Sequence, residues 1–240
     1  SYRKGRALLA PLVSSGDRQS MLPLASIESG LAQVSKEKGD RNAALAYYEA
    51  ARKLTDAVLD VTPGDRAALV FAAKLYADWT RTLMQLNDRR ARAAAERSMQ
   101  VANKLASLDP SNGEAQSTLA SAHNSMGAAS LAAAQTERAA ASYRESVRIR
   151  AALLQADPQN VALRRDLVIG YGTLGEVLGT RTGENLGDTA GAIAALESAL
   201  EHTRWMRGKD PADKRAVFDD ISVRLRLGAA LLESHKPDAA

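Results

Sequence analysis

One run of the sequence has the residue types and spacing of a cofactor-binding loop. Gly170–Gly175 spells G-x-G-x-x-G directly after the apolar stretch Leu167–Ile169. In dinucleotide-binding proteins these glycines let the backbone approach a pyrophosphate, and an acidic residue about twenty positions on binds the ribose. Glu184 or Asp188 would supply that residue here. Such a site needs a parallel sheet, however, and no other segment has a strand pattern. We therefore predict no bound cofactor and keep a small-molecule site near Gly170–Gly175 as an alternative function.

The other residues capable of catalysis or metal binding are dispersed along the chain. There is no cysteine, which excludes thiolate metal ligands and cysteine catalysis. The three histidines have no second histidine three or four residues away, and they are His123, His202 and His235. Asp219 and Asp220 are adjacent, so their carboxylates diverge around a helix and are expected to favour its N-terminal half through the helix dipole. We predict no catalytic residue, no metal site and no enzyme activity in this chain.

The composition indicates which elements hold these residues. Of the 240 residues, 45% are hydrophobic but only 4% are aromatic, and alanine alone is roughly a fifth of the chain. Small apolar residues suit close packing of helices, whereas strands favour β-branched and aromatic side chains. The composition therefore predicts an all-α protein. No stretch is apolar enough to cross a membrane, because the longest uncharged segment, Ala115–Thr136, is rich in Ser, Gln and Asn.

The charge distribution favours protein partners over nucleic acid. Lys and Arg number 32 and Asp and Glu 28, which gives a net charge of +4. Nucleic-acid-binding chains usually gather their surplus cations on one face or in a tail. The densest cationic run is diluted by two acidic residues and consists of Asp88, Arg89, Arg90, Arg92, Glu96 and Arg97. Nucleic-acid binding along this segment is kept only as an alternative function.

An internal repeat sets the predicted architecture. Four prolines recur 47, 48 and 53 residues apart, each two residues before an Asp or Asn, at Pro63, Pro110, Pro158 and Pro211. A proline ends one helix, and the following Asp or Asn caps the next. A second set of turns lies between the prolines, so each period contains two helices. We predict a lead or capping segment over 1–19, repeats over 20–63, 64–110, 111–158 and 159–211, a half repeat over 212–234 and a tail over 235–240.

Small residues recur at fixed distances from these prolines. Twelve residues before them stand Ala51, Ser98, Ser146 and Ala199, and seventeen after them stand Thr80, Gly127, Gly175 and Gly228. A small residue among large ones lets two helix backbones approach closely. We therefore predict stacked antiparallel helix pairs. Within the G-x-G-x-x-G run, only the third glycine belongs to this repeat pattern.

The repeat resembles the tetratricopeptide repeat (TPR). The first-helix residues that carry the resemblance are Tyr171, Leu174-Gly175 and Leu178, with weaker counterparts at His123, Met126-Gly127 and Leu227-Gly228. The second-helix residues are Gly187-Asp188, Ala192, Leu196 and Ala199. The period exceeds the family's 34 residues, so helices of about 18–22 residues are expected. The resemblance covers nearly the whole chain and implies a right-handed α-solenoid of about nine helices.

A closer likeness concerns the segments Ala156–Leu178 and Asn185–Ala192. They are similar to the long-period repeats that follow the kinase domain and transmembrane helix of certain bacterial serine/threonine kinases. The resemblance implies a non-catalytic sensor or docking region of such a kinase, and this chain itself has no kinase motif. The start at Ser1 suggests a piece of a longer protein. The sequence assigns no compartment, although attachment to a membrane kinase would favour the extracytoplasmic side.

In the TPR family the first helices line a concave groove that binds peptides. Carried over position by position, the resemblance implies that six residues, here named the groove residues, contact a partner: Gln33, Lys74, Arg81, Asn124, Glu176 and Leu225. Their mixed polarity suits an extended or helical peptide. The chain is therefore predicted to be a non-catalytic scaffold that binds a protein or peptide.

Two segments near the C-terminus depart from the repeat. The helix expected over Ala216–Ser234 has no second helix after it, so its apolar stripe needs a neighbouring element, a dimer mate or further chain to cover it. That stripe consists of Ile221, Leu225, Leu227, Leu231 and Leu232. Gly179–Leu186 is an insertion, and we interpret it as a tolerated longer turn, since lengthening a loop costs only tenths of a kcal/mol.

Overall fold

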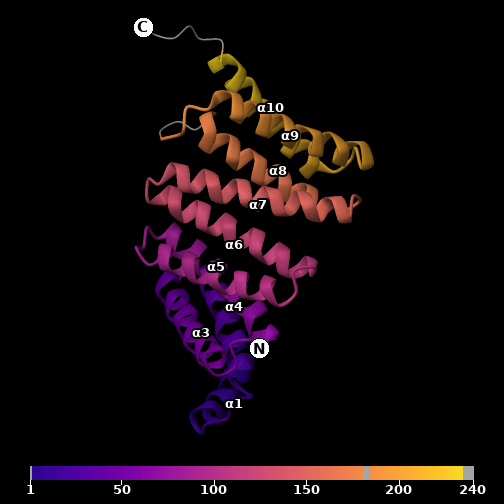
Figure 1. Ribbon diagram of the computed structural model, residues 1–240. Coiled ribbons are helices and arrows are strands. Elements are labelled where there is room, and N and C mark those ends of the chain that lie inside the picture. Colours follow the sequence, from indigo (N-terminus) through magenta and orange to yellow (C-terminus); the bar gives the residue numbers. More distant parts are fainter. Residues whose placement is uncertain (1, 181–183, 235–240) are drawn as a thin grey trace. The chain divides into compact units, whose positions relative to one another are not determined.

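The computed structural model describes residues 2–180 and 184–234, and every regular element in these ranges is a helix (Figure 1). The predicted tail with His235, and residues 181–183 of the insertion, lie outside the described residues. The elements are α1 (Tyr2–Ser14), α2 (Met21–Glu37), α3 (Arg41–Val61), α4 (Arg66–Gln85), α5 (Ala91–Leu108), α6 (Gly113–Ala132), α7 (Thr136–Ala156), α8 (Val161–Gly175), the π-helical turn η1 (Glu176–Thr180), α9 (Thr189–Lys209) and α10 (Lys214–Ser234). The prediction of an all-α fold is confirmed.

Side-chain caps form the helix starts at the four proline sites. Asp65, two residues after Pro63, accepts a hydrogen bond from the backbone N–H of Ala68 at 3.0 Å. The same cap is made by Asn112 to Ala115 at 2.9 Å, by Asn160 to Leu163 at 3.0 Å and by Asp213 to Ala216 at 3.1 Å. A cap of this kind stabilises its helix by about 1 kcal/mol relative to alanine. The prediction that each proline is followed by a capped helix is confirmed.

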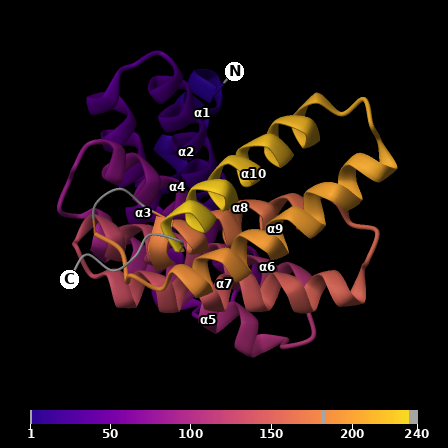
Figure 2. The ribbon, with the colours of Figure 1, turned by 90° about the horizontal axis from the view of Figure 1, so that it is seen from above.

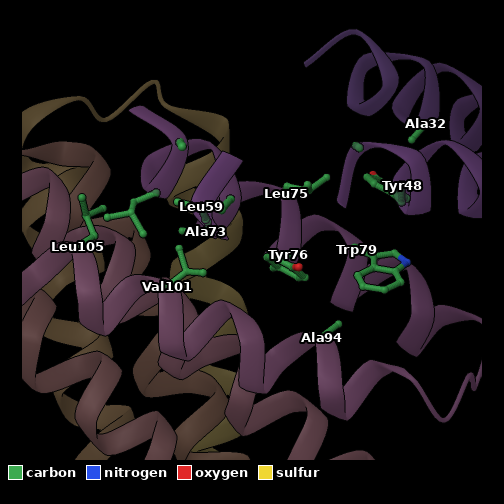
Figure 3. Packing of buried hydrophobic residues seen from close by; sticks show 14 of the residues in the cluster. Ala32, Tyr48, Leu59, Ala73, Leu75, Tyr76, Trp79, Ala94, Val101 and Leu105 are labelled. Atoms are coloured by element: carbon green, nitrogen blue, oxygen red, sulfur yellow. The ribbon is translucent and has the colours of Figure 1, made fainter. Parts of the chain in front are cut away.

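The residues group by their contacts into two compact units, 1–125 and 126–240, each described here by itself. In unit 1, α2 pairs with α3, α4 pairs with α5, and α3 packs on α4, so consecutive helix hairpins stack. Tyr48, Leu75 and Leu83 are no more than 1% exposed in its core. Figure 3 shows Tyr76 and Trp79 of α4 within the same cluster. This packing is that of an α-solenoid.

In unit 2, α8 packs on α7 and α9, and α9 forms an antiparallel hairpin with α10 (Figure 2). One apolar cluster includes Val168 of α8, Met206 of α9 and Val223 of α10, and Leu227 packs against it. Leu227 is therefore covered by a neighbouring element, which is one of the three coverings expected for the stripe of the last helix. The other four stripe residues are 41–73% exposed, and they are Ile221, Leu225, Leu231 and Leu232. Their covering by a dimer mate stays a prediction.

The repeated small residues mark close contacts between helices. The four that stand twelve residues before the prolines are buried, namely Ala51, Ser98, Ser146 and Ala199. A Cβ added to Gly127 would lie 2.9 Å from the Tyr143 ring, and one added to Gly175 would lie 3.0 Å from Leu196 Cγ. Gly228 holds the same repeat position, yet nothing lies within 4 Å of its Cβ site. Glycine is thus required by packing at the first two positions and not at the third.

The insertion begins at Gly179, within η1. The last carbonyls of a helix have no partner within it. Those of Val177 and Leu178 accept hydrogen bonds from the N–H groups of Leu186 at 3.1 Å and Asp188 at 2.8 Å. The described end of the insertion is therefore tied back to the helix from which it departs.

Candidate functional site

The two units divide the predicted groove residues between them. Gln33, Lys74, Arg81 and Asn124 fall in unit 1, on α2, α4 and α6, and Glu176 and Leu225 fall in unit 2, on η1 and α10. Lys74 and Arg81 are exposed, whereas Asn124 is half-buried.

In unit 1 a carboxylate joins two of the groove residues. Gln33 donates from Nε2 to Asp78 Oδ2 at 3.0 Å, and Arg81 donates from Nη1 to Asp78 Oδ1 at 3.1 Å. The side chain of Asp78 is 14% exposed and that of Arg81 is 61% exposed. Lys74 lies one helical turn before Asp78 on α4 and is exposed. Arg81 and Lys74 therefore present two cations to solvent, and Asp78 holds the first of them in place.

In unit 2 an ion pair crosses between two first helices. Arg226 of α10 lies with Nη2 3.0 Å from Glu176 Oε1. Its guanidinium passes over Gly172 of α8, where an added Cβ would lie 2.8 Å from Arg226 Nη1. Leu225, next to Arg226, is 71% exposed, and Ile169 of α8 is 51% exposed. This part of the predicted groove thus combines a partly solvated ion pair with exposed apolar side chains.

The two units repeat one contact that the sequence analysis missed. Asp78 and Arg226 each stand fifteen residues after a proline, and each bonds to a groove residue of the preceding first helix. Gln33 therefore corresponds to Glu176 in this contact. The partners are 45 residues apart in unit 1 and 50 in unit 2, so the repeat distance alone gave no signal for this contact. In both units, groove residues also serve as links between consecutive first helices.

The G-x-G-x-x-G run lies inside α8 rather than in a loop after a strand. The Cβ site of Gly170 is 3.0 Å from Val147 Cγ2, that of Gly172 faces Arg226, and that of Gly175 faces Leu196. Helix packing accounts for Gly170 and Gly175, whereas at Gly172 the near atom is the end of the flexible Arg226 side chain. A phosphate-binding loop needs free backbone N–H groups at a helix start, and the interior of α8 does not supply them.

The arginine run of α5 is paired with carboxylates along much of its length. Arg90 lies 2.7 Å from Asp88, Arg92 lies 3.0 Å from Glu96, and Arg97 lies 3.0 Å from Asp56, all measured between nitrogen and oxygen. Binding to a phosphate backbone depends on cations that are free to displace its counterions. The pairing therefore argues against the nucleic-acid alternative.

A cavity of about 650 Å³ between α3, α4 and α5 was not anticipated. Asp56 is its centre, because Oδ1 and Oδ2 accept from Tyr76 Oη at 2.8 and 2.7 Å, from Arg52 at 2.9 Å and from Arg97 at 3.0 Å. Burial, and then the bond to Asp56, raise the pKa of Tyr76, so its phenol stays protonated and donates. These groups satisfy one another, and Asp56 thereby joins three helices of unit 1.

Asp219 and Asp220 diverge as predicted, but their role differs from the one expected. Asp220 is 1% exposed and accepts from Thr203 Oγ1 at 2.8 Å, Arg207 Nη1 at 2.8 Å and Arg224 Nε at 2.9 Å. Asp220 thus joins α9 to α10 through side-chain bonds, a role that the sequence analysis did not predict. Among the described residues, no cluster of three or more His, Asp or Glu side chains could hold a metal ion.

His202 lies in a second cleft, in unit 2, between α7, α8 and α9. Its ring stacks on Tyr171 with centroids 6.0 Å apart, and Arg164 Nη1 lies 3.3 Å from its Nδ1. Burial, and then the charge of Arg164, lower the pKa of His202 below its usual value of 6.5, against the opposing effect of Glu201. The imidazole is therefore neutral at neutral pH.

This neutral histidine makes unit 2 sensitive to acid. Below about pH 6.5 the unfolded chain takes up a proton at His202 more readily than the folded chain, so the free energy of unfolding falls as pH is lowered. Because the ring is half-buried, we expect a loss below about 1 kcal/mol. Urea denaturation of the parent chain and of His202→Gln, in chloride buffers from about pH 7.5 to about pH 5.5, checks this. A parallel decline in both proteins would contradict it.

In the described ranges, no helix combines the length and apolar character needed to cross a bilayer.

Comparison with protein-family models and with curated proteins gives no match. Among solved structures, BtubC (BKLC) from P. vanneervenii is 17% identical, with a TM-score of 0.50 over 100% of this chain and 92% of its own. TTC0263, a thermophilic TPR protein in Thermus thermophilus, is 18% identical, with a TM-score of 0.39 over 97% and 100%. MamA protein is 15% identical, with a TM-score of 0.41 over 90% and 97%. Such similarity concerns the fold alone.

Proposed function

We propose that the chain is a non-catalytic scaffold that binds a peptide or protein through the groove residues of its first helices. The observation that carries this proposal is in unit 2, where Leu225 of α10 and Ile169 of α8 are 71% and 51% exposed, and where Arg226 of α10 pairs with Glu176 directly after α8. Large apolar side chains next to partly solvated polar groups are typical of surfaces that a partner covers.

Unit 1 would contribute charge to the same function. Lys74 and Arg81 are exposed on one helix, seven residues or two turns apart. Asp78 fixes Arg81 but leaves much of its guanidinium in solvent. A partner that suits this surface carries acidic side chains at matching spacing, since a carboxylate can pair with each cation.

The resemblance to repeats of bacterial serine/threonine kinases suggests where such a scaffold acts. In that setting the chain would be the sensor or docking region that brings a protein to the kinase. The segments behind the resemblance, Ala156–Leu178 and Asn185–Ala192, include Glu176 and its neighbours.

Alanine substitutions at exposed groove residues are expected to weaken partner binding and spare the fold. A peptide selected on the parent chain from a displayed library would be titrated against Lys74→Ala/Arg81→Ala and against Leu225→Ser. We expect the dissociation constant to rise about tenfold or more in at least one of these variants, because a few central contacts dominate binding. The free energy of unfolding should change by less than about 0.5 kcal/mol, since these side chains are exposed.

The matched control is Arg89→Ala/Lys104→Ala, which removes two exposed cations, one just before α5 and one on it. It should bind the peptide like the parent chain. If both groove variants bind as tightly as the parent, or if the control weakens binding equally, the assignment to the groove residues is wrong.

A further inference from the structure

Arg164 is a partly buried cation at the edge of the unit 2 cleft. The cleft has a volume of about 430 Å³, and its lining includes Arg164, Tyr171, His202, Ser198, Glu201 and Gln155. The guanidinium lies 3.8 Å above the centre of the Trp205 ring and donates from Nη2 to the carbonyl of Pro158 at 2.7 Å. Packing on an aromatic ring fixes the plane of the guanidinium and so its hydrogen-bonding directions.

No carboxylate neutralises Arg164 among the described residues. Its contacts are a neutral carbonyl, a neutral imidazole nitrogen and an aromatic face, and Nε is buried without a partner. The adjacent Arg165 differs, because it lies 2.8 Å from Asp213 and 3.4 Å from Asp219. Burial lowers the pKa of Arg164, as expected for a cation that is desolvated without a counter-charge.

The fold itself does not require this charge. Arg164 stands six residues after Pro158 and bonds to its carbonyl, and Gln116 stands six residues after Pro110 and bonds to that carbonyl from Nε2 at 3.0 Å. The neutral amide makes the same contact in the earlier repeat. At the same distance from Pro63 the chain has Leu69. A glutamine would therefore satisfy the structural role at position 164.

The neighbouring groups favour a singly charged anion. Two of the five N–H groups of Arg164 are used by Pro158 and His202 and a third, on Nε, is buried, which leaves two for a ligand. Because Arg164 donates to Nδ1 of His202, the ring proton lies on Nε2 and can be donated. Glu201 lines the same cleft and opposes a second negative charge. We infer that the cleft binds the carboxylate of an acidic peptide segment, held by Arg164 and His202. This site shares no residue with the groove and does not depend on the groove proposal.

Nuclear magnetic resonance of the tryptophan indoles can test this inference. The chain has two tryptophans, so the indole of Trp205 reports on the cleft and that of Trp79 serves as an internal reference. The probes are a blocked peptide with a single glutamate and inorganic phosphate, with potassium chloride added to equal ionic strength. We expect the peptide to shift the Trp205 resonance in a saturable way, and phosphate or chloride to do so at least about tenfold more weakly.

Substitutions can distinguish the effect of the Arg164 charge on peptide binding from the structural role of that residue. Arg164→Gln keeps the bond seen at Gln116 and should weaken peptide binding about tenfold or more, whereas Arg164→Lys should retain part of it. Arg138→Gln, at an exposed position of α7, should bind like the parent chain. Glu201→Gln should bind more tightly, since it removes the competing carboxylate.

Binding should also strengthen as the pH falls from about 7.5 to about 5.5, because a bound carboxylate favours protonation of His202. The charged or titratable groups that line the cleft with His202 are Arg164 and Tyr171 on α8 and Glu201 on α9. Non-saturable shifts, equal binding by Arg164→Gln, or tighter binding of phosphate than of the peptide would each overturn the inference. None of these outcomes bears on the groove variants, so the two proposals fail separately.

Discussion

Replacing Asp220 by alanine is expected to lower the free energy of unfolding by about 3 kcal/mol. The change would leave the Thr203 hydroxyl buried without its carboxylate partner, and it would leave Arg207 and Arg224 without theirs. Burial alone raises the pKa of Asp220, but the hydrogen bonds from Arg224, Thr203 and Arg207 outweigh it and hold the pKa below its usual value. The folded chain therefore favours the ionised form.

Urea denaturation at neutral pH measures this loss, with Glu197→Ala as the matched control. Glu197 is an exposed carboxylate on α9, and its removal should change stability by less than about 0.5 kcal/mol. Asp220→Asn should lie between the control and the alanine variant, because one amide oxygen can still accept. As pH falls through the lowered pKa of Asp220, the parent chain should lose its advantage over Asp220→Asn. A loss under about 1 kcal/mol for Asp220→Ala would contradict the role given to this residue.

Alanine at two equivalent glycines is expected to have opposite effects on stability. At Gly127 the new methyl group would lie 2.9 Å from the ring of Tyr143, which is only 4% exposed and has little room to move. Overpacking of this kind costs about 1–3 kcal/mol, against a gain of about 1 kcal/mol in helix propensity. We therefore expect Gly127→Ala to be destabilising by about 1 kcal/mol.

At Gly228 no atom lies within 4 Å of the new methyl group, so only the gain in helix propensity remains. Gly228→Ala should raise the free energy of unfolding by about 0.5–1 kcal/mol. Because both glycines hold the same repeat position, each variant is the control for the other. Denaturation midpoints that move in the same direction would show that the repeat alignment misjudges the surroundings of one of them.

The sequence predicted best those structural features that depend on residues close together in the chain. Asp65, Asn112, Asn160 and Asp213 cap the helices that follow the prolines, as expected, because a cap bonds to a backbone group three residues away. The burial of the recurrent small residues was equally accessible, since four copies of one pattern are visible in the sequence.

Contacts between distant residues could not be predicted in this way. Asp56 bonds to residues 20 and 41 positions away, and Arg226 lies 50 positions after Glu176. The repeat period alone does not say which polar residues meet across it. The missing counter-charge of Arg164 is likewise visible only in three dimensions, because acidic residues are close to it in sequence, as Asp166 shows.

The contacts Gln33–Asp78 and Glu176–Arg226 affect how easily adjacent first helices of each unit can move apart. Both are polar and partly solvated, so water can replace either of them at a cost of about 0–1 kcal/mol. The apolar contacts that hold neighbouring helices together elsewhere have no such substitute, since separating them exposes hydrocarbon to water. In each unit, adjacent first helices should therefore separate more easily at these polar contacts than at the apolar core. A large binding partner could then move the first helices apart without unfolding them.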